Sequence, residues 1–158
     1  MAKVLVGFMG SGKSTIAERL DPQFLDMDTY IEHKIGETIT DFFSKQGEKA
    51  FRAIETETLT DLLNRGHVLS TGGGVVTSAV NRKLLQEHKE VIYLCADFDT
   101  LYDRILSDKK NLRPLFLNNS RQGLKKIFEE RQEWYKEVAS QIIDVSNKTP
   151  EQIVEEIR

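Results

Sequence analysis

The chain has 158 residues, a length typical of one domain around one hydrophobic core. Hydrophobic residues make up 39% and charged residues 30% of the sequence, and no apolar run approaches the roughly 18 residues that a membrane-spanning helix needs. The formal charge of −3, with acids and bases interleaved, provides no broad positive field. We therefore expect neither nucleic acid nor a membrane as a partner.

The beginning of the sequence and its cysteine content favour a cytoplasmic protein. Residues 1–3 lead directly into a short apolar run and then glycine, a pattern too short for the apolar region of a signal peptide. Cys95 is the single cysteine, so an internal disulfide and a thiolate metal cluster are excluded. Its surroundings, VIYLCAD, predict a structural place at the end of a buried strand.

Short apolar runs alternate along the chain with longer amphipathic segments. The short runs are rich in β-branched or aromatic residues, as strands buried on both faces tend to be. They cover residues 4–6, 24–26, 68–70, 91–95 and 142–145. The amphipathic segments predict helices over residues 13–20, 28–36, 38–46, 48–66, 78–88, 100–107, 123–140 and 151–157. This order predicts a three-layer α/β/α fold with a five-stranded parallel sheet.

One segment differs from this alternation. Residues 107–122 are polar and turn-rich and contain Pro114, so they predict a mobile loop between two helices. Because this loop carries Arg113, it is a candidate lid over a binding site. We expect the whole chain, residues 1–158, to form one domain that includes this loop.

The most specific motif is GFMGSGKS, residues 7–14, which satisfies the pattern G-x-x-x-x-G-K-[ST] in full. It follows a predicted strand and opens a predicted helix, as a phosphate-binding P-loop does. Glycines let successive backbone N–H groups converge on phosphates, and the helix N-terminus favours negative charge. Lys13 would neutralise the β- and γ-phosphates, and Ser14 would bind Mg²⁺. The residues predicted to bind ATP here are Gly10, Ser11, Gly12, Lys13, Ser14 and Thr15.

Two carboxylates follow the second predicted strand. If the strand continues through Asp26-Met27-Asp28, both carboxylates share one face and Met27 points the other way. Neighbouring carboxylates repel unless a cation or a proton lies between them, which favours a magnesium site. The alternative is a solvated strand end followed by a helix with its N-cap at Asp28.

Two further patterns suggest an acceptor site. Arg52 and Glu55 lie at i, i+3 of a predicted helix, a spacing that also occurs in surface ion pairs. The segment STGGGVV, residues 70–76, places three glycines after a predicted strand, where a ligand can approach the backbone in a doubly wound sheet. No acidic residue ends that strand, so the magnesium role passes to Asp26 and Ser14.

Taken in order, these motifs resemble the shikimate kinase family of P-loop proteins. The resemblance covers nearly the whole chain, from GFMGSGKS through FLDMD, FRAIE, STGGGVV and LRPLF to ERQEWYKEVA. It implies ATP-dependent phosphorylation of shikimate to 3-phosphoshikimate with release of ADP, a step of chorismate and aromatic amino-acid biosynthesis. It also implies Mg²⁺ as cofactor, a monomer, and a helical substrate-binding region over about residues 29–61.

The resemblance further implies roles for single residues. Asp28 would contact the shikimate hydroxyls as the catalytic base, and Asp26 would hold magnesium. Catalysis would also use Lys13 and Arg113, the latter reaching the transferring phosphate from the lid. The residues implied to bind or orient shikimate are Asp28, Arg52, Gly73, Gly74 and Arg131, with Glu55 orienting Arg52. Lys148, in the segment 147–150, falls where the family places a loop that contacts adenine.

One feature departs from the family pattern. The stretch TIAERLDPQFL between Ser14 and Asp26 is shorter than expected, and Pro22 disfavours helical geometry at Asp21. We expect lower stability rather than lost chemistry, and the position of the second strand is in doubt.

Two alternative functions remain at this point. Another small-molecule kinase of the same fold, for gluconate or a nucleoside monophosphate, would share the P-loop and the lid. A GTP-dependent switch is disfavoured because NKTP, residues 147–150, lacks the aspartate of the guanine-binding pattern N-K-x-D.

Overall fold

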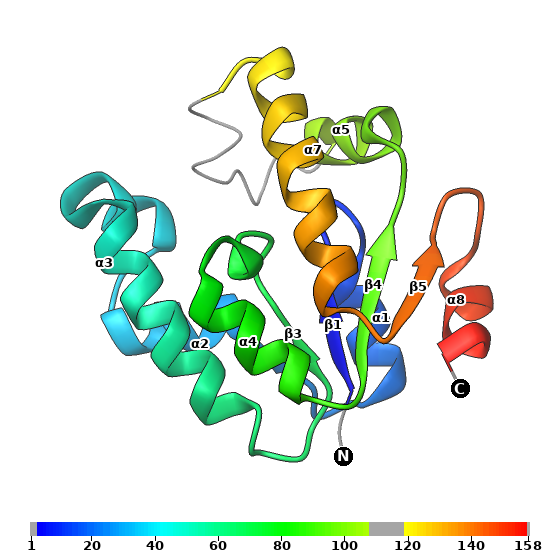
Figure 1. Cartoon of the computed structure of the whole chain (residues 1–158), viewed down its shortest axis with the longest axis horizontal. Helices are drawn as coiled ribbons and strands as arrows, with labels where there is room; N and C mark the ends of the chain where they lie inside the picture. The colour runs from blue at the N-terminus through cyan, green and yellow to red at the C-terminus, as the bar shows by residue number, and fades with distance from the viewer. Residues whose placement is uncertain (1–2, 108–118, 158) are drawn as a thin grey trace.

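The computed structural model describes residues 3–107 and 119–157. In this part of the chain, one sheet contains five parallel strands in the order β2-β3-β1-β4-β5 (Figure 1). The strands are β1 (Val4–Val6), β2 (Leu25–Asp26), β3 (Leu69–Ser70), β4 (Val91–Cys95) and β5 (Gln141–Asp144). All five predicted strands are confirmed, with bounds that shift by one residue at most.

Helices cover both faces of this sheet, which confirms the predicted three layers. α1 and α8 pack together on one face, and α4 and α7 pack together on the other (Figure 1). The helices are α1 (Lys13–Leu20), α2 (Met27–Ile35), α3 (Ile39–Leu62), α4 (Ala79–Glu87), α5 (Phe98–Ser107), α7 (Arg121–Val138) and α8 (Pro150–Ile157). A short 3₁₀ helix, η1 (Val75–Thr77), follows the glycine triplet and was not predicted.

Three residues set helix boundaries for the reasons that the sequence indicates. α1 ends before Asp21, whose extended φ of −152° suits a residue that precedes proline. Gly36 ends α2 in the left-handed conformation, with φ at 74°. Gly47, with φ at 85° and ψ at 174°, interrupts α3 and separates the two predicted helical segments.

The short connection after α1 leaves the second strand in place. Leu25 and Asp26 pair with Leu69 and Ser70 of β3, so β2 occupies the edge of the sheet next to β3. The Asp21 carboxylate accepts a hydrogen bond from the backbone N–H of Val68 at 3.2 Å. This bond joins the connection to the residue just before β3.

The hydrophobic core extends to the P-loop. Phe8, within that loop, is 1% exposed and makes an edge-to-face contact with Phe128 of α7, with ring centroids 5.3 Å apart. Phe128 also packs against Phe98 of α5 at 5.6 Å. Burial of one such ring contributes about 1.5–3 kcal/mol, so aromatic packing holds the loop against two helices.

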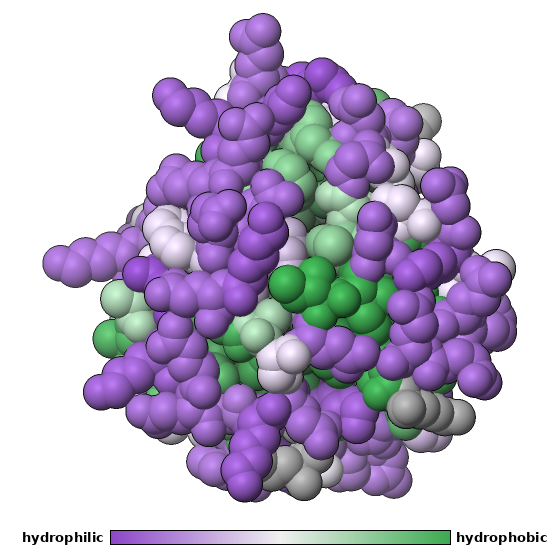
Figure 2. Space-filling model, turned by 45° about the vertical axis from the view of Figure 1, so that its right-hand side comes forward, coloured by the Kyte–Doolittle hydropathy of each residue, from purple (hydrophilic) through white to green (hydrophobic). Residues whose placement is uncertain are grey.

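The outer surface is mostly polar. Charged and polar side chains cover most of the face in Figure 2, with a smaller apolar area near its centre. Among the described residues, no helix combines the length and the apolar character needed to cross a bilayer. Cys95 ends β4 and packs, partly buried, against the core, and this burial raises the pKa of its thiol.

Candidate active site

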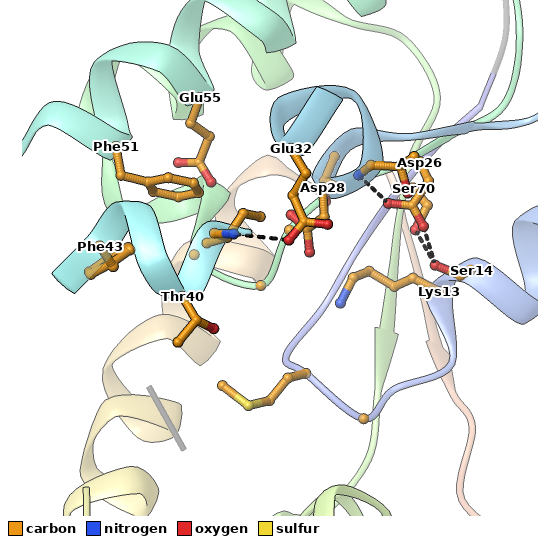
Figure 3. Close-up of a pocket in the computed structure, with 18 of the residues that line it drawn as sticks. Lys13, Ser14, Asp26, Asp28, Glu32, Thr40, Phe43, Phe51, Glu55 and Ser70 are labelled. Carbon is orange, nitrogen blue, oxygen red and sulfur yellow. Dashed lines mark hydrogen bonds between the residues drawn. The ribbon is translucent and has the colours of Figure 1, made fainter. Parts of the chain in front are cut away.

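A pocket of about 780 Å³ lies at the carboxyl ends of β1, β2 and β3. The P-loop, the start of α2, both parts of α3, the glycine turn and α7 contribute to its wall (Figure 3). Ligand crevices in doubly wound sheets form at this edge, where the strand order reverses. The predicted site residues that line the pocket are Gly10, Gly12, Lys13, Ser14, Thr15, Asp26, Asp28, Arg52, Glu55, Gly73, Gly74 and Arg131.

The P-loop has the predicted strand-loop-helix context. It joins β1 to α1, and Gly12 at the N-cap of α1 has φ at 89°, a conformation that favours glycine. The Lys13 ammonium donates hydrogen bonds to the carbonyls of Gly7 at 2.7 Å and Phe8 at 3.1 Å. Lys13 is buried and points into the pocket (Figure 3). Ser11 is also buried within the loop.

Oxygen atoms cluster beside the first turn of α1. The Ser14 hydroxyl donates to the Asp26 carboxylate at 3.0 Å, and its oxygen lies 3.4 Å from the Ser70 hydroxyl (Figure 3). Hydroxyl and carboxylate oxygens are hard ligands that suit Mg²⁺, which in proteins often uses only one or two carboxylates plus substrate phosphates. The cluster therefore fits a magnesium ion beside the P-loop.

The two neighbouring aspartates have different roles in the backbone, and of the two predicted possibilities the strand that continues through Asp28 is wrong. β2 ends at Asp26, which is the N-cap of α2 and accepts from the backbone N–H of Thr29 at 3.3 Å. Met27 begins the helix and is fully buried. The predicted alternative, an N-cap at Asp28, is two residues too late, because Asp26 is the N-cap and Asp28 already lies in the first turn. Both carboxylates still line the pocket.

Arg52 and Glu55 form a buried ion pair rather than a surface pair. One Arg52 nitrogen, Nη1, donates to both Glu55 carboxylate oxygens at 2.9 and 3.0 Å. The Glu55 side chain is 2% exposed and the Arg52 side chain 17%. Burial raises the pKa of the Glu55 carboxyl, and the positive charge of Arg52 opposes that rise. Glu48 adds a second, more exposed carboxylate at 3.3 Å from Arg52.

The glycine turn after β3 lies against these charged groups. A Cβ atom on Gly72 would lie 2.9 Å from an Asp28 carboxylate oxygen. A Cβ atom on Gly74 would overlap the Arg52 guanidinium. Glycine at these two positions therefore lets the backbone approach both side chains closely.

α7 contributes the second predicted arginine. Arg131 lines the pocket and is 6% exposed. One helical turn later, the fully buried Tyr135 hydroxyl donates to the Gly73 carbonyl and also interacts with Arg131. Burial raises the pKa of Tyr135 to about 12, so the hydroxyl keeps its proton at neutral pH. α7 is thereby joined to the glycine turn.

Comparison with known proteins agrees with this geometry. The family model described as shikimate kinase matches residues 9–158. The shikimate kinase of Streptococcus gordonii is 54% identical over the whole of this chain and 99% of its own length, and that of Streptococcus thermophilus is 51% identical over the same shares.

A solved structure gives the same result in three dimensions. The shikimate kinase from Acinetobacter baumannii in complex with shikimate is 35% identical, with a TM-score of 0.89 over 99% of this chain and 89% of that one. The chain belongs to the shikimate kinase family. Enzymes of this family catalyse the ATP-dependent phosphorylation of shikimate, within the pathway to aromatic amino acids, and that is the activity of this chain.

Of the predicted site residues that the structure describes, Ser11 and Lys148 do not line the pocket. Arg113 and most of the predicted lid, 107–122, lie outside the described residues. Lys148 lies between β5 and α8, where its ammonium pairs with Glu156 at 2.6 Å. The roles predicted for Arg113 and Lys148 stay predictions.

The shikimate kinase pocket also contains side chains that we did not select from the sequence. Phe43 and Phe51 line it from either side of the Gly47 kink, with ring centroids 5.2 Å apart. Arg104 of α5 also lines it and donates to the Gly10 carbonyl at 3.3 Å. The remaining lining residues that we did not select are Met9, Thr29, Glu32, Ile39, Thr40, Glu48 and Asn119, whereas Ser70, Thr71 and Gly72 belong to the predicted glycine segment. Hydrophobic periodicity placed the two phenylalanines on helices, but it did not show that they face a ligand site.

Proposed function

We propose that the pocket binds ATP on its P-loop side and shikimate on its α3 and α7 side, and transfers the γ-phosphate between them. The observation that carries this proposal is that one pocket joins Lys13 of the P-loop to Asp28 and to two arginines, Arg52 and Arg131. A nucleotide-binding protein without an acceptor needs only the first of these groups. A kinase for a hydroxylated acceptor that bears a carboxylate needs all of these groups.

On the nucleotide side, the P-loop binds the phosphates of ATP. Backbone N–H groups of residues 10–15 and the positive end of α1 face the phosphates, and Lys13 neutralises their charge. In the described structure the Lys13 ammonium donates hydrogen bonds to carbonyls of the loop. When ATP binds, these are replaced by hydrogen bonds to phosphate oxygens. Arg113 would add a further positive charge from the lid, as the resemblance implies.

Ser14 and Asp26 are the groups that would hold Mg²⁺. Their side-chain oxygens are 3.0 Å apart at the start of α1. When bound, Mg²⁺ neutralises phosphate charge as the γ-phosphoryl group transfers. The position of the ion would be set by Asp26, which is itself held in place as the N-cap of α2.

On the acceptor side, Arg52 and Arg131 bind the shikimate carboxylate. Hydrogen bonds between charged groups contribute about 1.5–3 kcal/mol each, so two guanidinium groups outweigh the cost of enclosing one anion. Glu55 orients Arg52 through the bonds to Nη1. Gly73 and Gly74 give the ring of the substrate access to the backbone beside Arg52.

Asp28 positions the acceptor hydroxyl and accepts its proton. The hydroxyl oxygen forms a bond to the γ-phosphorus as the bond from that phosphorus to the β–γ bridging oxygen breaks. The electron pair of the broken bond stays with ADP. Phosphoryl transfer of this kind depends on in-line placement and charge neutralisation more than on covalent chemistry by the protein.

A coupled assay of ADP release tests the proposal. We expect turnover that requires both shikimate and Mg²⁺, with gluconate and nucleoside monophosphates inactive as acceptors. Turnover with one of those acceptors and none with shikimate would contradict it.

For the metal site, Mn²⁺ binding in the presence of ADP, followed by electron paramagnetic resonance, should weaken in Asp26→Asn and not in Asp41→Asn.

Four general properties belong to the same proposal. The chain functions as one domain over residues 1–158, as a monomer in the cytoplasm, with residues 29–61 forming the substrate-binding region. Light scattering behind a size-exclusion column measures the mass of the particle in solution. A dimer that persists at nanomolar concentration would contradict the monomer.

A further inference from the structure

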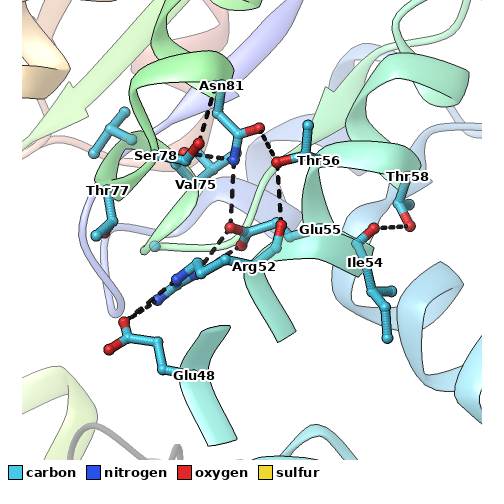
Figure 4. A network of polar contacts seen from close by, with 12 residues as sticks. Glu48, Arg52, Ile54, Glu55, Thr56, Thr58, Val75, Thr77, Ser78 and Asn81 are labelled. Carbon is cyan, nitrogen blue, oxygen red and sulfur yellow. Dashed lines mark hydrogen bonds and ion pairs between the residues drawn. The ribbon is translucent and has the colours of Figure 1, made fainter. Parts of the chain in front are cut away.

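Asn81 is the centre of a buried polar network that joins three elements (Figure 4). It lies in α4, its side chain is 0% exposed, and its Oδ1 atom accepts from the Thr56 hydroxyl of α3 at 2.7 Å. Its Nδ2 atom donates to the Val75 carbonyl of η1 at 2.9 Å and to Glu55 Oε1 at 3.4 Å. Each polar group of the amide therefore has a partner of the right kind.

The bond to Glu55 matters because that carboxylate is out of water. A buried carboxylate is stable only when donors satisfy its oxygens. Within the described part of the chain, Arg52 of α3 and Asn81 of α4 donate hydrogen bonds to Glu55. The other charged groups that face Glu55 are Asp28 of α2 and Arg131 of α7. The Asn81 amide thus adds a second donor, from a different helix, to the Glu55 oxygen Oε1 that Arg52 also bonds.

The position of Arg52 depends in turn on this carboxylate. Its guanidinium is held by Glu55 and Glu48 and lies directly against the Gly74 backbone. Val75, whose carbonyl accepts from Asn81, follows Gly74 in the chain. The same amide therefore holds both the carboxylate behind Arg52 and the turn in front of it.

We propose that Asn81 is a positioning residue for the acceptor. It holds Glu55 and the end of the glycine turn in fixed relative positions, and so it affects binding of the shikimate carboxylate through Arg52. This inference rests on the proposed role of Arg52 as a shikimate ligand. Asn81 is not among the residues that line the pocket, so its effect on the substrate is indirect.

A double-mutant cycle with Arg52 tests the mechanism. We expect Asn81→Leu to raise the Michaelis constant for shikimate by about tenfold, with kcat and the Michaelis constant for ATP changed by less than about twofold. If Asn81 acts through Arg52, then Asn81→Leu adds almost nothing in an Arg52→Ala background. A loss of folding alone would lower the active fraction, and therefore kcat, without changing the Michaelis constant for shikimate.

Two isosteric variants on α3 provide a matched pair. Each hydroxyl bonds the carbonyl four residues earlier, Thr56 that of Arg52 at 3.1 Å and Thr58 that of Ile54 at 2.8 Å. Thr56 also bonds Asn81, so Thr56→Val removes a contact to the network that Thr58→Val leaves intact. Both side chains lie on the same helix and lose the same atoms. We expect about a threefold rise in the Michaelis constant for shikimate in Thr56→Val and none in Thr58→Val. This pair decides the question even where Asn81→Leu does not fold.

The outcomes separate the two proposals. If Arg52→Ala leaves the Michaelis constant for shikimate unchanged, the proposed role of Arg52 fails, and the role of Asn81 fails with it. If Arg52→Ala raises that constant while Thr56→Val matches Thr58→Val, or while Asn81→Leu has the same effect with and without Arg52, only the role of Asn81 is overturned.

Discussion

Asp28 combines two properties that a catalytic carboxylate needs. It lies in the first turn of α2, where the helix N-terminus stabilises its negative charge, and it lines the same pocket as Lys13. Its carboxylate lies close to the Gly72 backbone, beside the glycine turn. It can therefore align a hydroxyl as well as accept its proton.

Asp28→Asn should remove the base while it preserves the shape of the side chain. We expect kcat to fall by about 10² to 10⁴, the usual contribution of a positioned general base. ADP affinity, measured by calorimetry, should stay within about twofold because the P-loop is untouched. Asp41→Asn, an exposed aspartate in the first turn of α3, is the matched control. Near-normal turnover in Asp28→Asn would exclude Asp28 as the base.

The arginine pair makes a second prediction at this scale. Arg52→Ala and Arg131→Ala each remove charge-assisted hydrogen bonds to the substrate carboxylate, so each should raise the Michaelis constant for shikimate by about 10- to 100-fold. Arg65→Ala, which breaks an exposed ion pair with Asp61, should leave that constant unchanged. An unchanged constant in both pocket variants would contradict the carboxylate clamp.

At the scale of elements, interruptions of regular structure form the pocket. The kink at Gly47 lets α3 contribute Phe43 and Phe51 to one wall. The glycine turn continues as η1 rather than as a loop, and Arg82 of α4 donates to the Val76 carbonyl in it at 2.7 Å. The guanidinium of Arg82 also stacks on Trp134 of α7 at 4.7 Å. Two helices thus hold the turn from outside the pocket.

Tyr135→Phe tests how α7 is coupled to the glycine turn. The variant removes the hydroxyl that donates to the Gly73 carbonyl and leaves a partly buried acceptor without this donor. We expect a loss of about 1–3 kcal/mol in the free energy of unfolding, measured with denaturant, together with a raised Michaelis constant for shikimate. Tyr30→Phe, at an exposed position, is the control. Full stability and unchanged affinity in Tyr135→Phe would show that the coupling has no energetic role.

At the scale of the whole molecule, the Asp21 carboxylate ties the short connection between α1 and β2 to the residue before β3. Asp21 accepts from the backbone N–H groups of Gln23 and Val68, and its other contact is the His67 ring at 3.0 Å. The hydrogen bond from Gln23 contributes most to lowering the pKa of Asp21 below its ordinary value of 3.8. The charged form of Asp21 therefore stabilises the fold.

The sign of this shift gives a dependence on pH. Because the pKa of Asp21 is lower in the folded chain, its contribution is present above pH 3.8 and is lost as the pH falls below that value. The melting temperature of Asp21→Asn should therefore lie below that of the wild type at neutral pH, and the gap should narrow as the pH falls below about 4. Asp61→Asn, which loses an exposed ion pair, is the control. A gap that stays constant with pH would contradict this role.

Much of the fold and part of the site could be predicted because their signals are local. The P-loop is a contiguous motif, and hydrophobic periodicity with Gly36 and Pro22 indicated where helices begin and end. The error at residues 26–28 has a local cause as well. The local pattern at these residues fits both the end of a strand and the start of a helix. The helix forms because it buries Met27 and because Asp26 caps its N-terminus.

The order of the elements and a phosphate-binding loop between β1 and α1 follow from the amino-acid sequence alone, since each depends on residues a few positions apart. Only the tertiary structure decided which distant groups meet. Tyr135 bonds Gly73 across 62 positions, and Asn81 bonds Glu55 across 26. No local pattern predicts such pairs, because they follow from the strand order and from helices that pack across the same face of the sheet. The acceptor site depends on these contacts, whereas the nucleotide site is encoded in one continuous segment.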